Sequence, residues 1–205
     1  MENTKCLDMK YVQFSKVGEI IEIICICLGV FAIPLIVPQL LSAIFGSTSV
    51  ITSSSQYVVG SLVNTLLILA GVNTNGWKKV TGIVTLPSIS ALFGGLVLKT
   101  SSIYTLYMIP AIWIGNFAII YLYRYLFVKK HFNYIATSIV AIITKCATIY
   151  CGFQLLVVAN IISGASKVFT ALNVAMGMNQ LITASIGAII AFGIIITMKK
   201  LKKIH

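Results

Sequence analysis

Long apolar stretches of helical length alternate along this chain with short polar segments. A helix needs about 20 mostly apolar residues to cross a membrane. The apolar runs are too long for the strands of a membrane barrel, and they lack strict two-residue alternation. We therefore predict a single all-α integral membrane domain over residues 1–205. It should be a six-transmembrane-helix bundle with helices at about 17–45, 56–73, 78–98, 103–127, 133–160 and 175–198.

The composition agrees with this pattern. Hydrophobic residues make up 59% of the chain and charged residues 9%. A soluble domain carries about 25% charged residues. The lipid bilayer is therefore the first partner that the sequence predicts.

The basic residues follow the polar gaps in a regular order. The chain has 15 Lys and Arg but only 4 Asp and Glu. Twelve of the basic residues lie at the start of the first stretch, after the second, after the fourth and at the end of the sixth, whereas the other gaps hold only Lys99 and Lys167. Cytoplasmic loops carry the excess of Lys and Arg, so we expect both termini in the cytoplasm. The charge forms no continuous basic face, so no nucleic-acid partner is expected.

Two irregularities interrupt the apolar pattern. The segment Gly46–Gln56 is polar and uncharged, which suits either a lid over the helix ends or a flexible connector. Prolines at positions 34, 38, 87 and 110 predict kinks in three helices. Kinked helices suit a protein with a central polar pocket, although proline is also common in ordinary membrane helices.

Small residues recur at every fourth position in the last stretch, in Ala184-x-x-x-Ala188 and Gly187-x-x-x-Ala191. Such spacing lets two helices approach closely. It is common by chance in apolar sequence, so packing within the chain is favoured over docking on a partner.

Lys145 is the one basic residue inside an apolar stretch. It lies more than three helical turns beyond the basic segment at 129–131, too far for its ammonium to reach the interface easily. A buried ammonium needs an anionic or carbonyl partner. The candidates are Glu19 or Glu22 in the first helix, polar carbonyl groups, or a substrate anion. A structural role and a ligand-binding role are both open.

Amides and aromatic residues in the helices are the other candidates for a site. Asn64, Asn116 and Gln154 can bind a ligand or can hydrogen-bond neighbouring helices. Trp113 and Tyr107 are candidate aromatic walls, although Tyr107 also suits an interfacial aromatic belt. Asn179 and Gln180 are expected at the outer interface.

No pattern in the chain indicates catalysis. No phosphate-binding loop, HExxH or GxSxG motif is present, and no nucleophile is paired with a base. The five cysteines lack the spacing of metal ligands. We therefore expect no enzyme activity, no catalytic residue, no metal and no cofactor.

The chain resembles the substrate-binding S components of energy-coupling factor (ECF) transporters, the bacterial vitamin importers. The resemblance covers the whole length and the six-helix layout. It is most specific in Val59–Leu67, Gly82–Pro87 and Ala91–Gly95, in Ile109-Pro110 with Gly115-Asn116, and around Lys145.

This resemblance implies a multi-pass protein of a bacterial cell membrane that binds a small vitamin-like nutrient on its outer side. It would dock on a transmembrane coupling protein driven by two ABC ATPases. The first outer loop would close the pocket, which corresponds to Gly46–Gln56. The family often carries an Ala-x-x-x-Ala docking motif in helix 1, and the nearest substitute here is Cys25-x-x-x-Gly29.

Two other functions remain open from the residues alone. One is a self-sufficient small secondary transporter or channel, against which the lack of helix carboxylates argues. The other is a non-transporting membrane subunit that assembles or anchors another complex.

Overall fold

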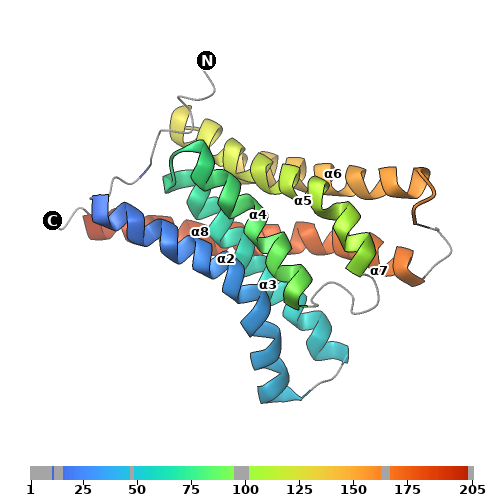
Figure 1. Cartoon of the computed structure of the whole chain (residues 1–205). Coiled ribbons are helices and arrows are strands. Elements are labelled where there is room, and N and C mark those ends of the chain that lie inside the picture. The colour runs from blue at the N-terminus through green and yellow to red at the C-terminus, as the bar shows by residue number, and fades with distance from the viewer. Residues whose placement is uncertain (1–10, 12–15, 47–48, 95–101, 163–166, 203–205) are drawn as a thin grey trace.

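The chain folds into a bundle of long helices (Figure 1). The computed structural model describes residue 11 and residues 16–46, 49–94, 102–162 and 167–202. No strand occurs in these ranges. The elements are α2 (Lys16–Phe45), α3 (Ser49–Asn73), α4 (Trp77–Gly94), α5 (Ser102–Leu122), the π-helix η1 (Tyr123–Lys129), α6 (Tyr134–Val158), α7 (Lys167–Met176) and α8 (Met178–Lys202).

Each of the six predicted apolar stretches contains one long helix, which confirms the all-helical class. Five helical segments in the described ranges are long and apolar enough to cross a membrane, while α4 is not among them. Residues 95–98 of the predicted third helix lie outside the described residues. The separate helix α7 was not predicted. Gly177 divides it from α8, and α8 therefore begins a few residues later than expected.

The prediction of a polar connection before the second helix is wrong for residues 49–55, which belong to α3. Gly46 ends α2 with a φ of 84°, and its N–H donates to the Ser42 carbonyl at 3.0 Å. This conformation is the usual glycine end of a helix. Residues 47 and 48 lie outside the described residues. Serine and threonine have helix propensities only about 0.5 kcal/mol below alanine, so a helix can include them at small cost.

The long helix α2 changes direction partway along its length (Figure 1). Pro34 and Pro38 lie inside it, and each removes one backbone donor. The Ser90 hydroxyl of α4 donates to the Phe31 carbonyl, in the turn before Pro34. A neighbouring helix thus satisfies part of the interrupted backbone, as membrane helices require. The kink brings Pro34 toward the interior, where it is buried.

Helix α3 is the centre of the bundle, because it packs against α2, α4, α5, η1 and α8. Its contact with α8 depends on small side chains. Ala184, Ala188 and Ala191 are buried. A Cβ atom on Gly187 would lie 2.7 Å from Asn64 Cβ and 2.9 Å from the Ser61 carbonyl oxygen. The preference for internal packing at these residues is therefore confirmed.

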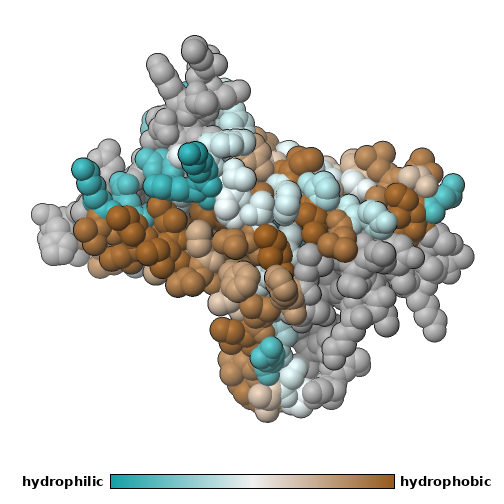
Figure 2. All heavy atoms as spheres, viewed as in Figure 1, coloured by the Kyte–Doolittle hydropathy of each residue, from teal (hydrophilic) through white to brown (hydrophobic). Residues whose placement is uncertain are grey.

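Several chain segments with basic residues meet at one end of the bundle. The Tyr11 N–H donates to the Val72 carbonyl at 3.0 Å, and Lys199 Nζ donates to the Tyr11 hydroxyl at 2.6 Å. The starts of α2 and α4, the π-helix η1 and the end of α8 lie toward this end (Figure 1). Figure 2 shows hydrophilic residues gathered there and hydrophobic residues over α2.

Arg124 was grouped from the sequence with the basic residues that flank the membrane, but the structure places it in the interior. Its side chain is fully buried. Its guanidinium donates to the carbonyls of Ala70, Gly71 and Thr74 at the end of α3. The last carbonyls of a helix have no partner within the helix. Arg124 therefore caps α3 and is not available to lipid headgroups.

Candidate functional site

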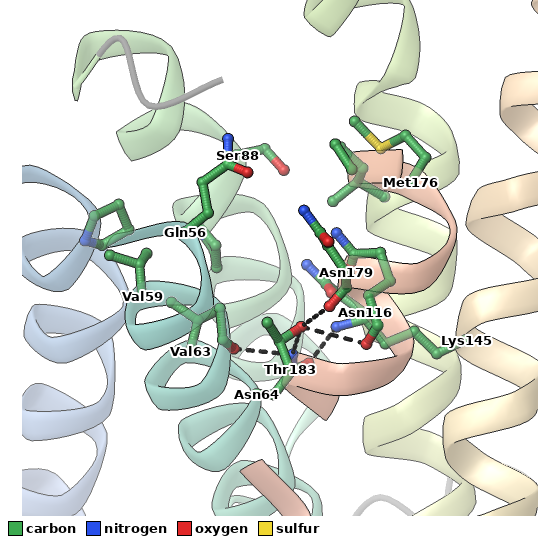
Figure 3. A pocket seen from close by; sticks show the side chains of 16 residues that line it. Gln56, Val59, Val63, Asn64, Ser88, Asn116, Lys145, Met176, Asn179 and Thr183 are labelled. Carbon is green, nitrogen blue, oxygen red and sulfur yellow. Dashed lines mark hydrogen bonds between the residues drawn. The ribbon is translucent and has the colours of Figure 1, made fainter. Parts of the chain in front are cut away.

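One face of α3 lines an internal cavity of about 160 Å³. The lining residues of α3 follow a helical spacing: Gln56, Val59, Gly60, Val63 and Asn64. The volume is several times what a single water molecule needs. Residues from six other helices complete the wall: Pro34, Pro87, Ser88, Ile112, Asn116, Lys145, Ala175, Met176, Asn179, Gln180 and Thr183 (Figure 3).

Lys145 lies on this wall and is only 3% exposed. Its ammonium donates a hydrogen bond to Asn64 Oδ1. Of the partners that the sequence left open, the structure therefore gives Lys145 a side-chain carbonyl oxygen. Glu19 and Glu22 lie near the start of α2, and Glu22 precedes the cavity residue Pro34 by twelve positions, about 18 Å along a helix.

Asn64 connects three helices at the cavity. Its oxygen accepts from Lys145 of α6, while its Nδ2 donates to the Gly60 carbonyl at 2.9 Å and to Thr183 Oγ1 of α8 at 3.3 Å. The Thr183 hydroxyl in turn donates to the Asn179 carbonyl at 2.8 Å. This network, drawn with dashed lines in Figure 3, sets the orientation of the Asn64 amide. The lysine is thereby held against a fixed partner.

The opposite helices contribute Asn116 and Ser88. Asn116 is buried on α5, and its Nδ2 makes a long hydrogen bond of 3.5 Å to the Val84 carbonyl. Ser88 follows Pro87 on α4 and is 5% exposed. Its hydroxyl has no hydrogen-bond partner within the described part of the chain. A buried polar group without a partner is unfavourable, so Ser88 is suited to contact a bound molecule.

Three of the predicted site residues meet at this cavity and three do not. Asn64, Asn116 and Lys145 line it. Tyr107 is about half exposed, and Gln154 is partly exposed outside the lining. Each lies nine residues from a lining residue of its own helix, Asn116 or Lys145, and nine residues at about 100° per residue amount to half a turn in net rotation. Both therefore occupy the opposite helix face.

Trp113, the predicted aromatic wall, also lies away from the cavity. Its ring packs against the main hydrophobic core, and its immediate neighbour Ile112 lines the cavity instead. Consecutive residues on a helix point about 100° apart, which accounts for the difference. The apolar part of the wall consists of aliphatic side chains and a methionine, and none of the described residues that line the cavity is aromatic.

Sequence reasoning missed the contribution of the α8 start. Asn179 and Gln180 were expected at the outer interface, but they line the cavity together with Thr183. The Tyr57 hydroxyl donates to Asn179 Oδ1 at 2.8 Å and ties α3 to α8. The four-residue spacing of Asn179 and Thr183 places them on one helix face. This spacing is the sequence feature that could have predicted a shared polar face on α8.

The described residues contain no group of three His, Cys, Asp or Glu side chains arranged to hold a metal ion. Cys25, Cys27, Cys146 and Cys151 are free thiols.

These features define a class: a helical protein with several segments able to cross a membrane, and an internal cavity that carries a buried lysine. No protein-family model, curated protein or solved structure matches the chain.

Proposed function

We propose that this protein is a membrane substrate-capture subunit of an ECF-type ABC importer, and that it binds a small vitamin-like nutrient in the cavity at Lys145. The single observation that carries the proposal is this cavity, with Lys145, Asn64 and Asn116 on its wall. Ionisable groups placed within membrane helices are rare and commonly mark a substrate site.

The chain has no acidic residue after Glu22 and no phosphate-binding loop. A relay of protons or sodium ions through helix carboxylates is therefore hard to build, and ATP hydrolysis by the chain itself is not expected. The energy for uptake would come from a transmembrane coupling protein and two ABC ATPases. The basic end of the bundle would face the cytoplasm, toward these partners.

The proposal is tested with the full chain purified in mild detergent. Thermal unfolding is measured with a panel of vitamins, nucleobases and amino acids, and proteins that purify with the chain are identified by mass spectrometry. Stabilisation by at least one compound, together with co-purified ABC ATPases, is expected. Flux through liposomes by the chain alone would favour a secondary transporter or channel. Neither ligand binding nor an ATPase partner would favour an assembly subunit.

A further inference from the structure

We propose that the ligand of this cavity is a small monocarboxylate with an apolar body, and that its carboxylate binds Lys145. The inference rests on the proposed function only in that it takes the cavity to be the ligand site. Three independent observations support it: the charge of the wall, its free hydrogen-bonding groups and the character of its remaining surface.

The cavity carries one uncompensated positive charge. Lys145 is the only charged side chain among the described residues that line it. The ammonium is paired with a neutral amide, and every residue after Glu22 in the chain is non-acidic. A charge in a medium of low dielectric constant attracts an opposite charge strongly. A ligand with one negative charge would neutralise the site, whereas a ligand with two would bring an unpaired negative charge into it.

The free groups of the wall are mainly hydrogen-bond donors. The ammonium of Lys145 has three N–H bonds, of which Asn64 accepts one. Both N–H bonds of Asn64 are used within the chain and its oxygen accepts from Lys145, so Asn64 orients the lysine and offers no donor to the ligand. Asn179 uses its oxygen to accept from Tyr57, which leaves its amide N–H bonds for the cavity.

Ser88 adds a hydroxyl that has no partner in the described part of the chain. Figure 3 shows Asn116, Asn179 and Lys145 grouped in one part of the pocket. An ionised carboxylate only accepts hydrogen bonds, so it complements this set of donors. A neutral carboxamide carries no charge to pair with the Lys145 ammonium, and its N–H groups cannot accept from that ammonium.

Apart from the amides Gln56 and Gln180 and the Thr183 hydroxyl, the rest of the wall is apolar. It consists of Pro34, Val59, Val63, Pro87, Ile112, Ala175 and Met176, together with Gly60. These side chains offer no partner to a polyol or a sugar, whose hydroxyl groups would lose their hydrogen bonds to water. The volume of about 160 Å³ is enough for a small molecule. A carboxylate on a short aliphatic or aromatic body meets all three conditions.

The experiment compares isosteric pairs of probes that differ only in charge. Benzoate with benzamide, and hexanoate with hexanamide, are titrated into the full chain in lipid nanodiscs, and binding is measured by calorimetry and thermal shift. We expect at least one carboxylate to bind at least ten-fold more tightly than its amide. Lys145→Met should remove this preference, while Lys130→Met, at an exposed position outside the cavity, should retain it.

Asn64→Asp is the second variant, chosen in case Lys145→Met does not fold. It would place a carboxylate of the chain against the Lys145 ammonium and so supply an internal counter-ion. We expect a folded protein, judged by an unchanged gel-filtration profile, that has lost carboxylate binding at least ten-fold. Retained carboxylate binding in Asn64→Asp would contradict the proposal.

The failure of this inference can be told apart from the failure of the proposed function. Equal binding of an amide and its carboxylate, or tighter binding of a neutral nutrient, a dicarboxylate or inorganic phosphate, would overturn the monocarboxylate assignment and leave nutrient capture standing. No binding of any probe, and none of any vitamin, nucleobase or amino acid, would overturn both.

Discussion

Arg124 and Lys145, the two buried cations in the described part of the chain, differ in how their charges are satisfied. Arg124 donates to three backbone carbonyls at the end of α3. Lys145 donates to one side-chain amide and borders a cavity. A buried charge that is surrounded by hydrogen-bond acceptors needs nothing further, whereas one with a single neutral acceptor has capacity left for a ligand. We therefore assign Arg124 to the fold and Lys145 to the site.

Replacement of Arg124 by methionine should destabilise the protein. The carbonyls of Gly71 and Thr74 would lose this donor in the interior, while the Ala70 carbonyl keeps its hydrogen bond from the Thr74 N–H. Each unsatisfied buried acceptor costs about 1–3 kcal/mol. We expect the midpoint of thermal unfolding in detergent to fall by about 4–8 °C, which corresponds to roughly 2 kcal/mol. Lys130→Met is the control, because Lys130 is exposed. An equal fall in both variants would show that the cap contributes nothing specific.

At the scale of elements, the contact between α3 and α8 determines the geometry of the site. Gly187 brings the α8 backbone against Ser61, Asn64 and Thr65. The Thr65 hydroxyl donates to the Gly187 carbonyl at 3.2 Å at the same place. This approach allows Thr183 to accept from Asn64, so the helix contact and the orientation of the lysine partner are linked.

Gly187→Ala should therefore separate α3 from α8. Its Cβ would lie 2.7 Å from Asn64 Cβ and 3.0 Å from the Thr65 nitrogen, closer than packed atoms tolerate. Overpacking of this kind costs about 1–3 kcal/mol, and ligand binding should weaken with it. The matched control is Gly193→Ala on the same helix, where an added Cβ meets no atom within 4 Å. Alanine is the better helix former, so the midpoint of thermal unfolding for this control should stay the same or rise. Equal stability of the two variants would contradict the proposed role of Gly187.

At the scale of the whole molecule, the described basic residues are distributed unequally along the bundle. Lys199, Arg124 and the start of α4 lie toward the same end as Tyr11. The end of α6 lies at the opposite end (Figure 1). An excess of Lys and Arg is typical of the cytoplasmic side, so this asymmetry predicts the orientation in the membrane.

The orientation is measured with single cysteines in a cysteine-free background. Lys130→Cys places a thiol just after η1 at the basic end, and Ala159→Cys places one at the exposed end of α6. A membrane-impermeant maleimide should label the Ala159→Cys variant in intact cells and the Lys130→Cys variant only after permeabilisation. The reverse labelling would invert the predicted topology.

The helices could be predicted from the sequence, but their rotations could not. The stretches around residues 17–45 and 133–160 agree closely with α2 and α6, since the length of an apolar run directly determines a membrane helix. The prediction failed at residues 49–55, a mainly polar segment that belongs to α3. The sequence also did not show that Gln154, proposed together with Lys145 as a pocket group, lies on the other face of α6.

The sequence by itself determined the all-helical class, the succession of apolar segments and the placement of Lys145 inside one of them. These properties depend on the local balance of apolar and charged residues, because each segment partitions between lipid and water largely according to its own composition. Only the tertiary structure decided that Lys145 donates to Asn64, that Thr183 and Asn179 line the same cavity as these two residues, and that Arg124 caps α3. The physical reason is that these contacts depend on how each helix is rotated about its axis and how closely it approaches its neighbours. Contacts between residues far apart in the chain, such as Gly187 against Asn64, set both.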